Sequence, residues 1–161
     1  MAKSKLSFCE KLRDSKDLPR VEKITGRMKT IWGSGTFVIP APIEVDAVMR
    51  GVPRGKLTTV NDIRAVLAKK HRATIACPIT TGIFALIAAR AADEEEQAGK
   101  KRVTPYWRTL KVGGELNPKY PGGIAVIRSR LEAEGHEVTA RGKRWFVVGH
   151  EKRLARLAGS P

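Results

Sequence analysis

The chain has 161 residues, with 31 Lys and Arg against 16 Asp and Glu, so its formal net charge is +15. Its 42% hydrophobic content supports a folded core and excludes a wholly disordered chain. No stretch approaches the ~20 apolar residues of a membrane span, and the first residues lack the apolar segment of a signal peptide. We therefore expect a cytoplasmic protein (nucleoid-associated if prokaryotic) that binds a polyanion rather than a membrane.

The chain divides at a change of composition near residue 42. Residues 1–42 are predicted to be a basic N-terminal arm and linker, because Pro19 interrupts a short amphipathic pattern and residues 33–42 are rich in Gly and Pro. Residues 43–150 carry regular apolar patterns and are predicted to form the domain. Residues 151–161 are expected to be a basic tail.

Two helices with a long connection are predicted at the start of this domain, after a short helix that begins at residue 43. Thr59 is a suitable N-cap, with Asp62 three residues further on, for the first of them. Thr80 and Thr81 indicate the start of the second, which ends before Gly99. The connection between them exceeds the ~3–4 residues of a compact helix-turn-helix.

The second half of the domain is expected to contain one more helix and a hairpin. Apolar residues at helical spacing predict the helix over residues 124–131, and a turn at residues 141–143 predicts the hairpin over 136–148. The predicted fold class is mainly α with a small β component: a winged helix-turn-helix-like domain with a long inter-helix loop and a C-terminal hairpin.

Four short motifs occur in a recognisable order. Residues 53–63 contain Pro-Arg-Gly-Lys-Leu-Thr-Thr followed by Asp-Ile, residues 105–108 read Pro-Tyr-Trp-Arg, residues 120–123 read Tyr-Pro-Gly-Gly, and residues 131–135 read Leu-Glu-Ala-Glu-Gly. Together they resemble the DNA-binding domain of the alkylguanine-DNA alkyltransferases over residues 43–135. The resemblance implies double-stranded DNA as the partner, with alkylated bases as a target and repair proteins acting downstream.

The resemblance departs from the family at the reactive centre. Tyr106 and Trp107 stand where the family carries its nucleophilic Cys and the His that activates it, so only Glu134 of that relay is present. A phenol with an ordinary pKa near ~10 is a poor alkyl acceptor at neutral pH. The chain therefore looks most like the alkyltransferase-like proteins, which recognise alkylated bases without repairing them, and no catalytic residue or cofactor is expected.

The same resemblance implies two sets of site residues. Tyr106, Trp107 and Tyr120, with Glu134, would form a base pocket, although the aromatic rings would equally suit a structural core. Residues expected to contact DNA at the start of the second helix or through phosphates are Ile79, Thr80, Thr81, Gly82, Lys56, Arg72, Arg141, Lys143 and Arg144. Val60 and Ile79 occupy the positions of the family's base-rotating Tyr and its inserted Arg, so Ile79 would act as an apolar wedge.

Alternative interpretations stay open at the level of sequence. A winged-helix architectural or regulatory protein would bind duplex through charge alone, and an enzyme would need a relocated nucleophile, for which Cys77 is the candidate. His71, His136 and His150 show no metal-ligand spacing with a cysteine, so no metal site is predicted. The acidic run 93–96 is expected to be a solvated helix end, and the protein is expected to be a monomer.

Overall fold

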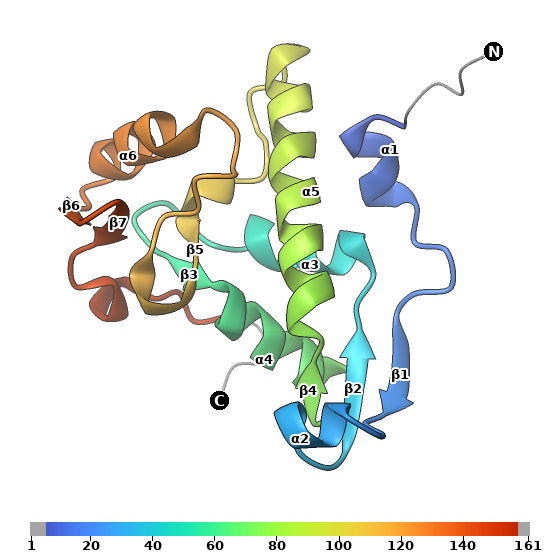
Figure 1. Ribbon diagram of the computed structural model, residues 1–161. Helices are drawn as coiled ribbons and strands as arrows, with labels where there is room; N and C mark the ends of the chain where they lie inside the picture. The colour runs from blue at the N-terminus through green and yellow to red at the C-terminus, as the bar shows by residue number, and fades with distance from the viewer. Residues whose placement is uncertain (1–5, 158–161) are drawn as a thin grey trace.

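Helix α5 (Pro78–Gln97) is the centre of the fold, and the other elements surround it (Figure 1). The computed structural model describes residues 6–157, which form six α-helices and three small β-sheets. Alanines at 85, 88, 89, 91 and 92 are almost fully buried along α5, because small side chains let neighbouring helices approach its backbone. The predicted fold class, mainly α with a small β component, is confirmed.

The first helices begin close to where the sequence signals predict. Helix α3 spans Pro42–Arg50, and helix α4 spans Val60–Lys70 after strand β3 (Thr58–Thr59). The Thr59 hydroxyl accepts a hydrogen bond from the Asp62 amide at 3.2 Å, which confirms the predicted N-cap. The connection to α5 is long because it contains strand β4 (Ile75–Ala76), which pairs with an N-terminal strand.

The prediction of a basic arm and linker is corrected for residues 6–42. Helix α1 (Phe8–Arg13) packs along α5. Strands β1 (Arg20–Lys23) and β2 (Thr36–Ile39) pair antiparallel, and the chain between them contains the short helix α2 (Met28–Trp32). Strand β2 also pairs in parallel with β4. The partner of β2 in strand β4 is 38 residues away, and Glu94 of α5, which binds α1, is 86 residues from Phe8, so the composition of the segment could not reveal them.

The second half of the domain packs against the same hydrophobic core as the first half. A 3-10 turn (Tyr106–Arg108) leads into strand β5 (Thr109–Leu110), which pairs in parallel with β3. After a second 3-10 turn (Val112–Gly114) comes helix α6 (Gly123–Ala133). Strands β6 (Val138–Arg141) and β7 (Arg144–Val147) form the predicted C-terminal hairpin.

The segment expected to be a basic tail is folded back on the domain as far as it is described. A 3-10 turn (His150–Arg153) is followed by a backbone bridge between Leu154 and Leu57, and Leu157 is buried against Val52 and Val66. Apolar residues at 154 and 157 explain this docking, since their burial removes hydrocarbon from water. The remaining expected arm and tail residues, 1–5 and 158–161, lie outside the described residues.

Two kinds of feature are absent from residues 6–157. None of their helices is long and apolar enough to cross a membrane. Over the same residues, no group of three or more His, Cys, Asp or Glu side chains is placed to hold a metal ion.

Candidate nucleic-acid interface

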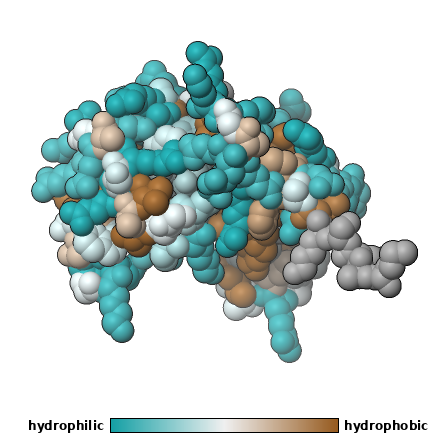
Figure 2. Space-filling view, turned by 90° about the horizontal axis from the view of Figure 1, so that it is seen from above, coloured by the Kyte–Doolittle hydropathy of each residue, from teal (hydrophilic) through white to brown (hydrophobic). Residues whose placement is uncertain are grey.

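The first two turns of α5 carry an exposed apolar ridge. Ile79 is 65% exposed and Ile83 is 50% exposed, one helical turn apart, and the space where a side chain on Gly82 would project is open. Large exposed apolar side chains at this spacing form one contact surface. Figure 2 shows a different face, seen from the C-terminal end of α5, which is mostly hydrophilic with hydrophobic patches. Ile79 and Gly82 are thus accessible, as the DNA-binding prediction requires.

The two threonines of this segment differ in accessibility. Thr81 is fully buried, and its hydroxyl donates to the Cys77 carbonyl at 2.7 Å. The expectation that Thr81 contacts DNA is therefore corrected: the side chain lies on the core side of α5, because the helix begins at Pro78 rather than at Thr80. Thr80 is half-buried, and its hydroxyl has no hydrogen-bond partner within residues 6–157.

The three aromatic side chains predicted for the base pocket do come together. The Tyr106 ring lies edge-on to Trp107 and to Tyr120, with centroid distances of 5.3 and 5.9 Å. Tyr106 is only 1% exposed, and this burial raises the pKa of its hydroxyl above the ordinary value of 10.0. Its hydroxyl points to the Pro121 carbonyl, 3.4 Å away. Tyr106 therefore fills the space between its two neighbours.

Two separate cavities flank this aromatic cluster, in place of the single pocket expected from sequence. One, of about 480 Å³, is lined by Trp107 together with Arg108 and Arg130. The other, of about 370 Å³, is lined by Tyr120, its neighbours Pro121 and Gly122, and Arg90. Both volumes fall within the range of ~300–1,000 Å³ that small-ligand sites occupy. The predicted pocket is thus divided by the buried ring of Tyr106.

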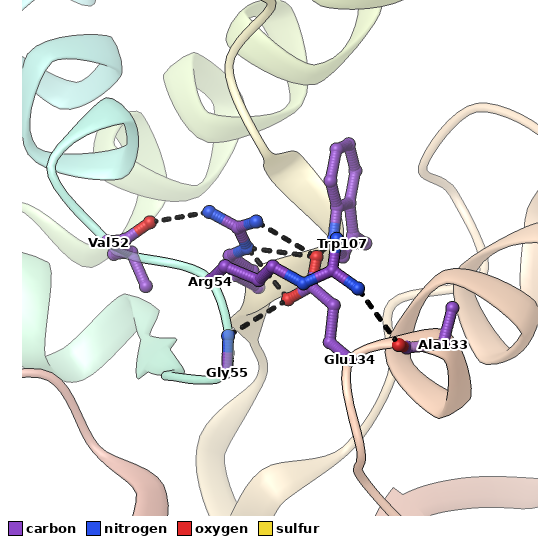
Figure 3. Close-up of polar contacts among 7 residues, drawn as sticks. Val52, Arg54, Gly55, Trp107, Ala133 and Glu134 are labelled. Carbon is purple, nitrogen blue, oxygen red and sulfur yellow. Dashed lines mark hydrogen bonds and ion pairs between the residues drawn. The ribbon is translucent and has the colours of Figure 1, made fainter.

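Glu134 holds the motif that begins at Pro105 in place (Figure 3). Its carboxylate accepts hydrogen bonds from the Trp107 indole at 2.7 Å, from the Arg108 guanidinium at 2.9 Å and from the Gly55 amide at 3.3 Å. Arg108 also donates to the Val52 carbonyl at 2.8 Å. The network therefore joins the turn before β3, the 3-10 turn and the end of α6.

The electrostatics of this network favour an ionised carboxylate. Burial alone would raise the pKa of Glu134, but the hydrogen bonds from Arg108, Trp107 and Gly55 outweigh it and hold the pKa below the ordinary value of 4.5. The Glu134 side chain is 5% exposed and that of Arg108 is 13% exposed. Glu134 thus lies beside the aromatic cluster and anchors the side chains of Trp107 and Arg108.

The acidic run at the end of α5 is an anchoring segment, not the solvated helix end expected from sequence. Glu94 accepts hydrogen bonds from the first amides of α1, Glu95 lies 3.8 Å from Arg50 of α3, and Glu96 forms a two-point ion pair with Arg130 of α6 at 2.6 and 3.1 Å. Each carboxylate therefore ties a different element to α5. This pairing also reduces the repulsion that the run would exert on a nucleic acid.

The predicted phosphate contacts lie on exposed turns. Arg72 follows α4 with a left-handed backbone (φ 54°), and Lys56 lies in the turn before β3. Arg141 and Lys143 are exposed at the hairpin turn, and neither forms an ion pair within residues 6–157. Arg144 differs, because it donates to Glu115 at 2.7 Å and is thereby partly neutralised.

Cys77 lies in a small apolar cluster away from the Tyr106 motif. It is 6% exposed and is packed with Ile24 and Phe37. A nucleophile must reach its substrate, and this thiol is covered by the N-terminal segment, which is folded onto the domain instead of forming an arm. The cluster gives the relocated-nucleophile interpretation no structural support.

Three further residues of the site carry no signal in the predicted motifs. Arg130 lies over the Trp107 ring at 4.4 Å, Glu115 fixes the hairpin through Arg144, and Phe8 lines the cavity that contains Tyr120. Alternation of charge along α6 could have indicated an exposed face for Arg130, but no local pattern links Phe8 or Glu115 to partners this distant in the chain.

The central helix, the Glu134 network and the C-terminal hairpin belong to one helix-rich fold with small β-sheets. The structure is similar to that of S. pombe Atl1, solved in complex with damaged DNA containing O6-carboxymethylguanine, with a TM-score of 0.50 and 16% sequence identity. The similarity covers 71% of this chain and 94% of that chain, and at this identity it shows the fold alone. No family model matches the sequence, and no curated protein matches it.

Proposed function

We propose that this protein is a non-enzymatic duplex-DNA-binding protein that recognises an extruded, alkylated base. The observation that carries the proposal is the fold shared with Atl1, a protein solved in complex with damaged DNA. The net charge of +15 supports a nucleic-acid partner independently, because cations that neutralise phosphates supply sequence-independent affinity.

In the proposed complex, the apolar ridge of α5 meets a DNA groove. Ile79 and Ile83 are exposed, although removing such apolar side chains from water is favourable. Apolar side chains that enter a DNA groove can wedge between base steps. Arg72, Lys56 and the hairpin cations Arg141 and Lys143 would hold phosphates on either side. The ridge would supply shape recognition, while the exposed turns supply charge.

The cavity that contains Tyr120 is the proposed base site. Its lining includes the Tyr120 side chain, which is 3% exposed, the Phe8 side chain, the residues Pro121 and Gly122, and charged side chains at Arg90 and Asp93. Extruded bases are typically read by this combination of stacking and polar edge contacts. The cavity containing Trp107 is less suited to a base, because five Lys and Arg side chains line it beside a single aromatic ring.

The absence of repair chemistry is part of the proposal. The residues at the family's reactive positions are a buried phenol whose pKa is raised and an indole that donates its N–H to Glu134. Neither group provides an activated nucleophile at neutral pH. A direct test is incubation with duplex carrying labelled O6-methylguanine. Covalent label that disappears in Cys77→Ala would refute the non-enzymatic assignment.

Binding to matched duplexes tests the recognition step. We expect the protein to bind a duplex with a single O6-methylguanine more tightly than the same duplex with guanine, measured by fluorescence anisotropy. Equal affinity for both, at every salt concentration, would remove lesion recognition and leave the architectural alternative. No affinity for either duplex would overturn DNA binding itself.

The salt dependence should identify the phosphate contacts. The double variant Arg72→Glu/Lys143→Glu is expected to weaken binding to both duplexes equally and to lower the slope of log affinity against log salt by about 0.9 for each phosphate that is no longer neutralised. Lys23→Glu/Lys29→Glu, on the edge strand β1 and on α2, is the matched double charge reversal and should leave the slope closer to that of the wild type. A slope unchanged by the double variant would exclude these two turns from the interface.

A further inference from the structure

The cavity proposed as the base site has a wall that comes from the N-terminal helix. Its lining includes Phe8 of α1 as well as Tyr120, Arg90 and Gly122. Helix α1 lies beside the upper half of α5 (Figure 1), and the cavity lies between α1, α5 and the turn before α6. An element with no part in the motif resemblance thus completes the site.

Helix α1 is docked firmly enough to position this wall. The Glu94 carboxylate accepts hydrogen bonds from the amides of Phe8 and Cys9 at 2.9 and 3.0 Å, and Leu12 is buried in the main core. A helix of six residues is unstable alone in water, so its conformation depends on these contacts. The position of Phe8 is therefore determined by α5.

The Phe8 ring faces chemistry suited to an aromatic ligand with an apolar substituent. The Arg90 guanidinium lies 5.3 Å from its centroid, and the Lys11 ammonium lies 4.7 Å from it. Tyr120, Asp93 and Glu94 also line the cavity, and the two carboxylates can accept hydrogen bonds. A purine amino group suits the carboxylates, and an alkyl group suits the hydrocarbon of Phe8, because neither then leaves a buried polar atom unpaired.

We propose that Phe8 is a specificity-determining residue of the base site and contacts the O6-alkyl substituent of an extruded guanine. This inference rests on the proposed function and deepens it, because it assigns preference for the alkyl group to a side chain outside the motif-bearing segment. Tyr120 and Arg90 then contact any base that enters the cavity, whereas Phe8 contacts only the alkyl substituent.

The test compares the affinity ratio of two duplexes, O6-methylguanine over guanine, in three variants. Phe8→Ala is expected to lower this ratio about fourfold, the scale of burying one methyl group, with little change for the guanine duplex. Leu12→Ala, which weakens the docking of α1 through another residue, should lower the ratio in the same way. Arg13→Ala, an exposed change on the same helix, is the control and should keep the wild-type ratio.

The outcomes separate the two proposals. A wild-type protein without preference for the alkylated duplex would overturn the proposed lesion recognition and the role of Phe8 with it. A wild-type preference that persists in Phe8→Ala would overturn the role of Phe8 alone. Tighter binding of both duplexes by Phe8→Ala and Leu12→Ala would also overturn it, because α1 would then obstruct the site. Circular dichroism confirms that each variant is folded.

Discussion

Replacing Glu134 by alanine is expected to lower the free energy of unfolding by about 3–5 kcal/mol, which is typical of removing one partner from a buried ion pair. The change leaves the Arg108 guanidinium, 13% exposed, without its carboxylate and the Trp107 indole without its acceptor. It also disconnects the Gly55 amide from α6. Denaturant unfolding followed by tryptophan fluorescence measures the loss.

The acid sensitivity of the same residue gives an independent check. The pKa of Glu134 is lower in the folded protein than its ordinary value of 4.5, so the stabilisation is complete above that pH and is lost as the pH falls through the folded pKa. Glu134→Gln should therefore show a smaller decrease in stability between pH 5 and pH 3 than the wild type. Identical acid profiles for the two proteins would show that the carboxylate is not held as an ion.

Other carboxylates with lowered pKa values also contribute to the loss of stability in acid. The pKa values of Glu44 and Glu115 are also lowered: burial opposes the shift of Glu44 but the hydrogen bond from Lys70 outweighs it, and for Glu115 the Arg144 hydrogen bond is the main cause. Both residues are present in Glu134→Gln, so their acid response is common to the two proteins. Only the difference between the profiles reports on Glu134.

The second large effect concerns DNA binding. The double variant Ile79→Glu/Ile83→Glu is expected to weaken duplex binding at least about 100-fold. It removes two apolar side chains from the interface, each worth about 1.5–3 kcal/mol when fully buried, and sets two carboxylates against phosphates. The fold should persist, because both isoleucines are already exposed. Anisotropy at one salt concentration measures the change.

A matched isoleucine distinguishes this site from a general charge effect. Ile31 on α2 is 78% exposed, so Ile31→Glu makes the same single substitution as Ile79→Glu alone, on a helix outside the ridge. A comparable loss of affinity in Ile31→Glu would show that net charge alone controls binding. Wild-type affinity in Ile79→Glu/Ile83→Glu would exclude the start of α5 from the interface.

The acidic run of α5 illustrates why part of the site could not be predicted from the sequence. Four consecutive acidic residues after an apolar helix have the pattern of a solvated end, yet Glu94, Glu95 and Glu96 contact α1, α3 and α6. The contact of Glu94 with α1 joins residues 86 positions apart. Charge pattern reports which residues are polar, whereas the identity of a distant partner depends on how the helices cross.

The aromatic cluster also shows which features the motifs predict and which depend on the tertiary structure. The motif order placed Tyr106, Trp107, Tyr120 and Glu134 together, and the structure confirms that they are neighbours. It also shows that the ring of Tyr106 is buried between Trp107 and Tyr120, and that these two residues line different cavities. Motif spacing identifies which residues meet, but the direction of each ring depends on packing against α5 and α6.

The +15 charge, the capped start of α4 at Thr59 and the C-terminal hairpin were determined by the sequence itself. These features follow from composition or from interactions between residues a few positions apart, which a local pattern records. The tertiary structure alone decided that residues 6–42 complete the fold, that the acidic run anchors three helices and that Phe8 lines a cavity. Each of these depends on contacts between segments distant in the chain, and such contacts form only when the whole core assembles.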